Sequence, residues 1–360
     1  MDFTRTLKYY VFVPLYNIKV AEELLETKIF DDYLIIKSKN LILNHGQYLY
    51  KEDYFTKQLF QDIAERHPDK LIWYPFAEYV LCTEFSIEDN QEVYTKKVYE
   101  IRQQICNIIL SLRLISSGRC QIYNGYYLAN GHSACSQFKV SSQLLNMERS
   151  HRTYNNSLVV ENLYELTQDK LEKGTTLFKR LQTLPKNACA VPIVYFNKYY
   201  DSLLPHERII QLAIFLESTL LAGQTDELNY RLCLRASAFL GKDLSKIFKL
   251  FYAIRSQIVH NGHINQNKDK ATIKRLKKLL NSDSEDETEL LFYFVNDCVE
   301  PVIREILHKS LLLISSGTIK NFEDLTQQID NFIVQQITMT KFETKYFEKP
   351  DLVKSGVKDE

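Results

Sequence analysis

The chain has 360 residues, of which 45% are hydrophobic and 25% are charged. These fractions are typical of a globular protein with a sizeable core, and they exclude a disordered or fibrous chain. Lys plus Arg and Asp plus Glu number 45 each, so the net charge is zero and any surface for a nucleic acid has to be a local patch.

The first half of the chain predicts a mixture of strands and helices. Three β-prone runs are Tyr9–Val13, which Pro14 should end, Tyr33–Ile36 and Tyr79–Phe85. Apolar residues three or four positions apart predict a helix between about 95 and 115.

Two Asn-Gly pairs give the clearest turn signals. Asn124–Gly125 separates Cys120–Tyr123 from Tyr126–Ala129, and Asn130–Gly131 precedes Cys135–Val140. A type I′ turn needs positive φ at both central residues, which Asn and Gly tolerate, so we predict a β-meander. From about residue 158 the leucine spacing predicts a helix whose apolar side contains Leu163, Leu166, Leu171 and Leu177.

The second half predicts longer helices joined by short links, a pattern typical of a helical bundle. Pro and Gly residues at the expected ends support the boundaries, and Ser284 with Glu287 fits a capping box at the start of the last helix. The four helices are expected from Pro205 to Gly223, over Asp226–Leu240 with a stop at Gly241, over Asp243–Asn261 with a stop at Gly262, and from the acidic stretch Asp283–Glu289 to about Ile314.

These elements together predict an α+β protein with two parts. Residues 1–200 should form a mixed α/β N-terminal domain with a sensing or regulatory role. Residues 201–348 should form an all-α domain built around a four-helix bundle, and 349–360 a loose charged tail.

Candidate chemistry lies at the end of the third predicted helix. Arg255 and His260 are separated by four residues, and Asn261–Gly262 follows directly. The partial negative charge of a helix C-terminus favours a protonated imidazole, and a guanidinium matches phosphate geometry with two donors. The pair could therefore hold a phosphate and transfer a proton. Such pairs also arise by chance, and a His that caps a helix beside a surface Arg is the alternative.

The surrounding sequence resembles the HEPN domain, and in particular its ApeA-like branch of anti-phage nucleases. The similarity covers about a third of the chain. The family signature is an Arg and a His separated by four to six residues near the end of the third helix. The resemblance is carried by Arg208–Leu221, Leu232–Gly241 and Leu250–Gly262.

The resemblance implies a metal-independent endoribonuclease without a cofactor. Two protomers would pair so that both Arg-His sets face one cleft, and the substrate would be host RNA. His260 would act as base or acid on the ribose 2′-hydroxyl and Arg255 would stabilise the phosphate, leaving a 2′,3′-cyclic phosphate. DNA, which lacks this hydroxyl, should resist. The role would be anti-phage defence by abortive infection, with a possible phage-derived trigger.

Two other hypotheses remain open at this point. The helical domain could be a non-catalytic HEPN module that binds RNA, a nucleotide or a partner protein. Alternatively, the N-terminal half could recognise a phage product while the helices only dimerise.

Several neighbours of the pair are candidates for supporting roles. Ser256 occupies the position where many family members have Asn, Asp or His, and Asn261 follows the His directly. Glu217 lies on the apolar face of the first predicted helix and needs a partner, for which Arg235 and Arg255 are candidates. This ion pair could brace the bundle or serve catalysis.

A basic stretch follows the pair. Lys270, Lys274, Lys277 and Lys278 share one face of an amphipathic segment, opposite Ile273, Leu276 and Leu280. The lysines could bind RNA phosphates, or they could form an ordinary solvated surface that the acidic segment behind it neutralises.

The cysteines indicate neither a metal site nor a secreted protein. Cys120, His132 and Cys135 lack the paired spacing of a zinc site, so we expect no metal. Seven dispersed cysteines argue against a disulfide framework. Met1 to Arg5 do not begin a signal peptide, and no apolar run approaches the ~18 residues of a membrane span. We therefore expect a cytoplasmic protein with no membrane partner.

Overall fold

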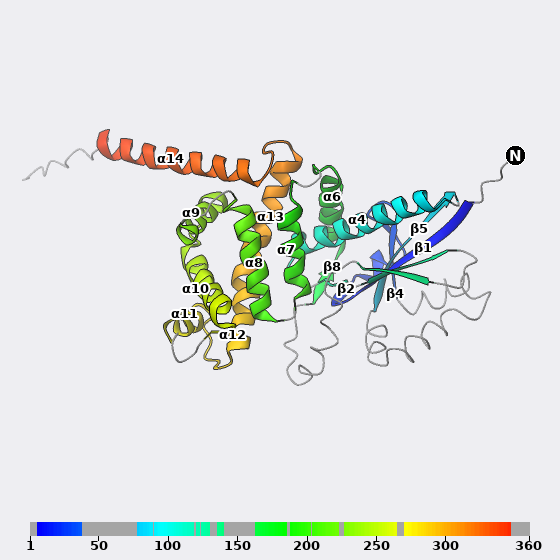
Figure 1. The fold of residues 1–360 in the computed structure, drawn as a ribbon, viewed down its shortest axis with the longest axis horizontal. Helices are drawn as coiled ribbons and strands as arrows, with labels where there is room; N and C mark the ends of the chain where they lie inside the picture. Colours follow the sequence, from blue (N-terminus) through cyan, green and yellow to red (C-terminus); the bar gives the residue numbers. More distant parts are fainter. Residues whose placement is uncertain are drawn as a thin grey trace, which may run out of the picture.

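The computed structural model combines a small sheet with a larger set of helices. Figure 1 shows the sheet at one end, the helices at the other, and the long helix α4 reaching from the first to the second. The chain is thus mixed α and β and mostly helical, as its sequence predicts. The described residues are 6–37, 78–88, 90–118, 120–122, 124–129, 135–139, 163–185, 188–202, 204–222, 227–264 and 270–346. Of these, only the backbone is described at 135–139, at 337–346 and over most of 124–129.

Six strands form an antiparallel sheet in the order β3-β4-β5-β1-β6-β7. The predicted strands at Tyr33 and Tyr79 are confirmed as β4 and β5. The bounds of the six strands are β1 Thr6–Leu15, β3 Lys28–Ile29, β4 Tyr33–Lys37, β5 Tyr79–Glu88, β6 Asn124–Ala129 and β7 Cys135–Lys139.

The expectation that Pro14 ends the first strand is wrong, because β1 continues through it to Leu15. Pro14 stays paired with Val80 of β5 on one side. On the other side, pairing with β6 stops at Phe12 and resumes at the isolated bridge between Tyr16 and Gln121. The proline, which has no N–H to donate, therefore lies where this ladder is interrupted.

The meander prediction holds only for the hairpin of β6 and β7. Asn124–Gly125 is not a turn, because both residues belong to β6 and pair with β7. The segment before it contributes only the bridge of Gln121 with Tyr16. The second predicted turn, Asn130–Gly131, lies outside the described residues.

The helix expected from about 158 begins later. Tyr164–Leu166 forms strand β8, which pairs in parallel with β2, Ile18–Val20. Helix α6 covers only Gln168–Gln182, with Leu171 and Leu177 buried as predicted. Residues Leu163 and Leu166 precede it because strand pairing with a segment about 150 residues earlier overrides the local helical pattern.

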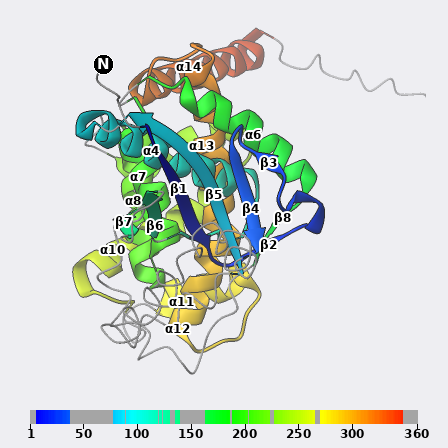
Figure 2. The same ribbon diagram turned by 90° about the vertical axis from the view of Figure 1, so that its right-hand side faces the viewer.

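Helix α4, Gln91–Ile115, covers the sheet and confirms the helix predicted between 95 and 115. It begins at Asn90, whose side chain accepts hydrogen bonds from the N–H groups of Glu92 and Val93. Ile101, Ile105 and Ile108 pack against the apolar side chains of β1, and Figure 2 shows the helix behind these strands. The last turns of α4 instead contribute Leu110 and Leu114 to the core of the helical half.

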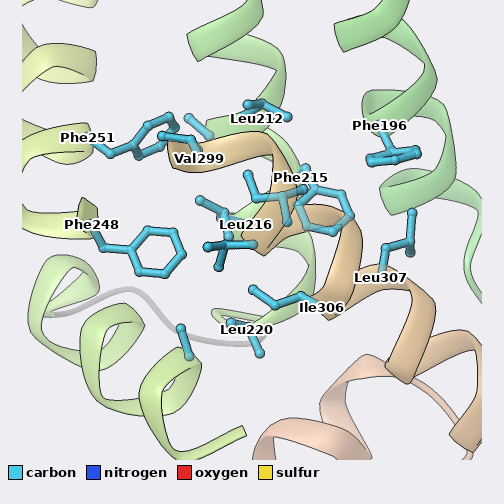
Figure 3. Close-up of a cluster of buried hydrophobic side chains, with 14 of the residues drawn as sticks. Phe196, Leu212, Phe215, Leu216, Leu220, Phe248, Phe251, Val299, Ile306 and Leu307 are labelled. Atoms are coloured by element: carbon cyan, nitrogen blue, oxygen red, sulfur yellow. The ribbon is translucent and has the colours of Figure 1, made fainter. Parts of the chain in front are cut away.

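The helical half is organised around α8, whose apolar side chains lie between those of α10 and α13 (Figure 3). Pro205 opens α8 and Gly241 and Gly262 cap α9 and α10 with positive φ, as predicted. The bounds are α7 Ala190–Asp201, α8 Pro205–Thr219, α9 Leu228–Leu240, α10 Ser245–Asn261, α11 Lys270–Leu280, α12 Glu287–Tyr293, η4 Phe294–Val299, α13 Glu300–Ser315 and α14 Phe322–Tyr346, preceded in the N-terminal half by the short 3-10 helix η1 Glu22–Leu24.

Three details of this half differ from the predictions. Helix α8 ends at Thr219, before Gly223. The cap of α12 is Asp286, which accepts from the N–H groups of Thr288 and Glu289, whereas Ser284 donates its hydroxyl hydrogen to Glu289. Helix α14 was not predicted as a separate element. It follows a turn at Gly317 and packs across α8 and α9.

The helix expected up to Ile314 contains a π-helical segment, η4, between α12 and α13. The N–H of Glu300 donates to the carbonyl oxygen of Val295, five residues back. We attribute this wider turn to Pro301, which has no N–H and whose ring would clash with the carbonyl four residues earlier in a regular α-helix.

A buried polar group connects the two halves of the chain at this point. Arg113 of α4 is 2% exposed and donates to the Asp201 carboxylate (3.3 Å), the Asn197 side chain (2.7 Å) and the carbonyl of Cys120 (3.1 Å). Its guanidinium also lies over the ring of Tyr200, whose hydroxyl donates to Glu300 at 2.6 Å. One arginine thus joins α4 to α7 and, through Tyr200, to α13.

We predict that Arg113→Ala lowers the free energy of unfolding by about 3–5 kcal/mol, because the buried Asp201 carboxylate loses its ion pair with Arg113. Arg102→Ala, at an exposed position of the same helix, should change stability by less than about 0.5 kcal/mol. Urea denaturation of both variants measures the difference. Equal losses would contradict the assignment of a linking role to Arg113.

Candidate functional site

The end of helix α10 carries the residues that the sequence singles out. The buried residues of this helix are Phe248, Leu250, Phe251, Ile254 and Ile258, and the remaining positions face outward or lie at the edge of the core. The helix ends at Gly262, which adopts a φ of 77° and donates its N–H to the carbonyl of Ile258 at 2.8 Å. The local sequence alone therefore fixes where this helix stops.

Arg255 lies at the edge of the core and forms an ion pair with Glu217 of α8. Its Nη2 donates to Oε1 of Glu217 at 3.0 Å, and the two side chains are 32% and 30% exposed. Of the two partners that the sequence allowed for Glu217, the structure has Arg255. The carboxylate is only partly buried, so the cost of burial expected from its position on the apolar face is reduced.

Arg235 has a different partner and a different place. It is 1% exposed, and its guanidinium donates to both carboxylate oxygens of Asp330 on α14, at 2.7 and 2.6 Å. A third bond reaches the carbonyl of Leu220 at the end of α8 (2.7 Å). Arg235 therefore braces α8, α9 and α14, which is the bracing role that the sequence analysis considered for Glu217. Asp330 gave no sequence signal, because α14 itself was not predicted.

His260, Ser256 and Asn261 are all exposed on the solvent side of α10. Arg255 and His260 are five residues apart, which separates them by about 140° around the helix axis and about 7.5 Å along it. Ser256 and His260 are four apart and share a face. A single chain therefore presents the histidine to solvent and the arginine toward Glu217 of α8.

Tyr252 is a member of this group that the sequence analysis missed. It lies three residues before Arg255 on the same face of α10. Its hydroxyl oxygen is buried and makes no hydrogen bond to any residue in the described part of the chain. Burial raises the pKa of Tyr252, the negative charge of Glu217 raises it further, and Arg255 opposes both effects. The spacing from Arg255 is the one sequence signal that could have identified it.

Helix α11 presents part of the predicted basic face. Lys270, Lys274 and Lys278 are exposed, and Leu276 is fully buried beneath them. Lys277 differs, because it is half-buried and forms an ion pair with Glu285 of the acidic segment. Among the described residues, Lys277 is thus the one of the four lysines that forms an ion pair with the acidic segment, as the alternative of an ordinary neutralised surface predicts. The side chains of Gln257 and Thr272 join α11 to α10 at 3.3 Å.

Two apolar residues that flank the Arg-His pair, Phe251 and Ile258, could belong either to a dimer interface or to the core of the chain itself. Phe251 is 0% and Ile258 6% exposed, and both pack in the helical core. Core packing therefore accounts for their apolar character. Exposed apolar side chains do occur on α9 and α10, where Tyr230 is 65% and Val259 50% exposed.

Cys120 is the one residue of the possible zinc set, Cys120, His132 and Cys135, whose side chain the structure describes. Cys120 is buried, which raises the pKa of its thiol to about 11, and it carries the carbonyl that Arg113 binds. His132 and the side chain of Cys135 lie outside the described residues. Within the described ranges, no group of three His, Cys, Asp or Glu residues is placed to hold a metal ion.

Comparisons with known proteins identify no relative. No family model matches the chain, and neither a curated protein nor a solved structure is significantly similar to it. In the part of the chain that the structure describes, no helix is long and apolar enough to cross a membrane.

Proposed function

We propose that this chain is a metal-independent endoribonuclease of the HEPN type that acts in anti-phage defence by abortive infection. The observation that carries the proposal is the arrangement at the end of α10. An arginine at the edge of the core and an exposed histidine occupy its last turns, beside a helix with three exposed lysines. The resemblance of the sequence around Arg255 and His260 supports the same function.

The reaction would be transesterification within the RNA. His260 accepts the proton of a ribose 2′-hydroxyl, and the oxygen attacks the neighbouring phosphorus. The bond to the 5′-oxygen breaks, this oxygen takes up a proton, and a 2′,3′-cyclic phosphate remains. Arg255 stabilises the negative charge that accumulates on the phosphate. The attacking and leaving oxygens lie on opposite sides of phosphorus, so one histidine cannot easily serve both.

The acid that protonates the leaving 5′-oxygen would be His260 of a second protomer. A two-fold axis beside α10 would bring both Arg-His sets to one cleft, and a two-fold interface uses the same patch on both chains. The exposed apolar residues Tyr230 and Leu234 on α9 and Val259 on α10 form the patch that we assign to this interface.

Cleavage of total RNA in the presence of EDTA tests the chemistry. We predict that Arg255→Ala and His260→Ala each lower the cleavage rate ~100- to 10,000-fold, the usual effect of losing one positioned catalytic group. His263→Ala, at an exposed position three residues farther on, should retain the wild-type rate. DNA of the same sequence should not be cut. Full activity of folded His260→Ala would refute the site, and RNA that is bound but never cut would favour the non-catalytic module.

A dimer at micromolar concentration is the second expected outcome. Replacing Tyr230 and Val259 together with Ser should produce monomers with little activity, because the interface loses its apolar centre. The matched control replaces Tyr99 and Val191, which are 61% and 51% exposed on α4 and α7. Light scattering gives the oligomeric state of both variants. A wild-type monomer with full activity would contradict the shared site.

The lysines of α11 make a third, separable contribution. We predict that Lys270→Ala, Lys274→Ala and Lys278→Ala combined weaken RNA binding and reduce the slope of log affinity against log salt by roughly 2, since each lost contact to single-stranded RNA removes about 0.7. Lys277→Ala, whose cation is already paired with Glu285, should change the slope much less. Fluorescence anisotropy across a salt series measures both. An unchanged slope in the triple variant would leave α11 as ordinary surface.

A further inference from the structure

Glu217 binds the guanidinium of Arg255, which in the proposed function would bind a phosphate of the RNA. Oε1 of Glu217 accepts from Nη2 of Arg255 at 3.0 Å. A carboxylate and a phosphate both offer anionic oxygens to a guanidinium, so they compete for the same donors. Because both side chains are about a third exposed, at 32% and 30%, an incoming phosphate can reach the pair.

Two donors beside this ion pair have no acceptor. The hydroxyl of Tyr252 and Nε of Arg255 are buried, and neither makes a hydrogen bond within the described part of the chain. The charges of the ion pair act on this hydroxyl, because Glu217 raises the pKa of Tyr252 and Arg255 lowers it. Buried donors without acceptors are rare in folded proteins. The Tyr252 hydroxyl is therefore a donor that a displaced Glu217 carboxylate could use.

We infer that Glu217 acts as an internal substitute for the RNA phosphate on Arg255, and that Tyr252 receives its carboxylate when RNA binds. In the RNA-free chain Glu217 holds the guanidinium. When a phosphate takes Nη2, the displaced carboxylate accepts a hydrogen bond from the buried Tyr252 hydroxyl, which then gains an acceptor. This inference rests on the proposed function, because it requires Arg255 to bind phosphate.

The surrounding core confines this exchange to side chains. Leu212 and Leu216 of α8 lie opposite Phe251 of α10 in Figure 3, and all three are fully buried. Glu217 follows Leu216, and Tyr252 follows Phe251, so both positions are attached to residues that cannot move without opening the core. Changes of side-chain rotamer at Glu217 and Arg255 are enough to exchange the partners.

Binding of a 2′-O-methyl RNA of mixed sequence, which cannot be cleaved through its 2′-oxygen, tests the exchange by anisotropy. Glu217→Gln should bind this probe roughly fivefold more tightly than the wild type, because the competing charge is gone. Glu305→Gln is the matched control. It also removes one charge from a Glu that is 34% exposed and paired with lysines, among them Lys242 in the turn before α10. This control should change binding much less.

Tyr252→Phe removes only the hydroxyl. It should leave the thermal unfolding midpoint unchanged, since that hydroxyl makes no hydrogen bond to the described residues, and it should weaken probe binding roughly threefold. In the Glu217→Gln background the same substitution should have little effect, because no displaced charge then needs a donor.

The outcomes separate this inference from the function on which it rests. If Arg255→Ala binds the probe as tightly as the wild type, the phosphate contact and the exchange are both wrong. If Arg255→Ala weakens binding but Glu217→Gln matches Glu305→Gln, only the exchange is wrong. Glu217→Gln with weaker binding and a lower unfolding midpoint would show instead that Glu217 simply braces the helices.

Discussion

The packing of α8 against α10 is the constraint on which the rest of the helical half depends. Leu216 and Phe251 are fully buried in one core, and this fixes the rotation of each helix about its own axis. The next residue on α8 is Glu217, and four residues beyond Phe251 on α10 is Arg255. Their pairing at 3.0 Å is therefore a consequence of apolar packing. A volume change at Leu216 or Phe251 would shift the charged pair as well as the core.

Two arginines of the helical half, Arg235 and Arg255, both bind a carboxylate but differ in how deeply they are buried. Arg235 is 1% exposed and binds both oxygens of Asp330, so opening this pair would leave a buried charge without compensation. Arg255 is 32% exposed and binds one oxygen of Glu217. Water can replace that bond at small cost, so the ion pair of Arg255 is the easier of the two to open.

The two halves of the chain are mechanically connected through α4. Its middle turns pack against the sheet, and its last turns share the core of the helices. Arg113 adds a buried polar contact to α7, and Tyr200 extends it to Glu300, next to the π-helical turn at Pro301. The sheet and the helices α7 and α13 are therefore packed against one and the same helix.

The sequence by itself determined the features that depend on neighbours along the chain. The start of α8 at Pro205 and the ends of α9 and α10 at Gly241 and Gly262 follow from backbone chemistry, and so does the placement of Arg255 and His260 in the last turns of α10. Only the tertiary structure decided which partner each group meets. It placed Asn124–Gly125 inside a strand beside β7 and paired Tyr164–Leu166 with β2. It also formed the ion pairs of Glu217 with Arg255 and of Asp330 with Arg235. Each of these outcomes depends on a contact between residues far apart in sequence, and the energy of such a contact appears in no local pattern.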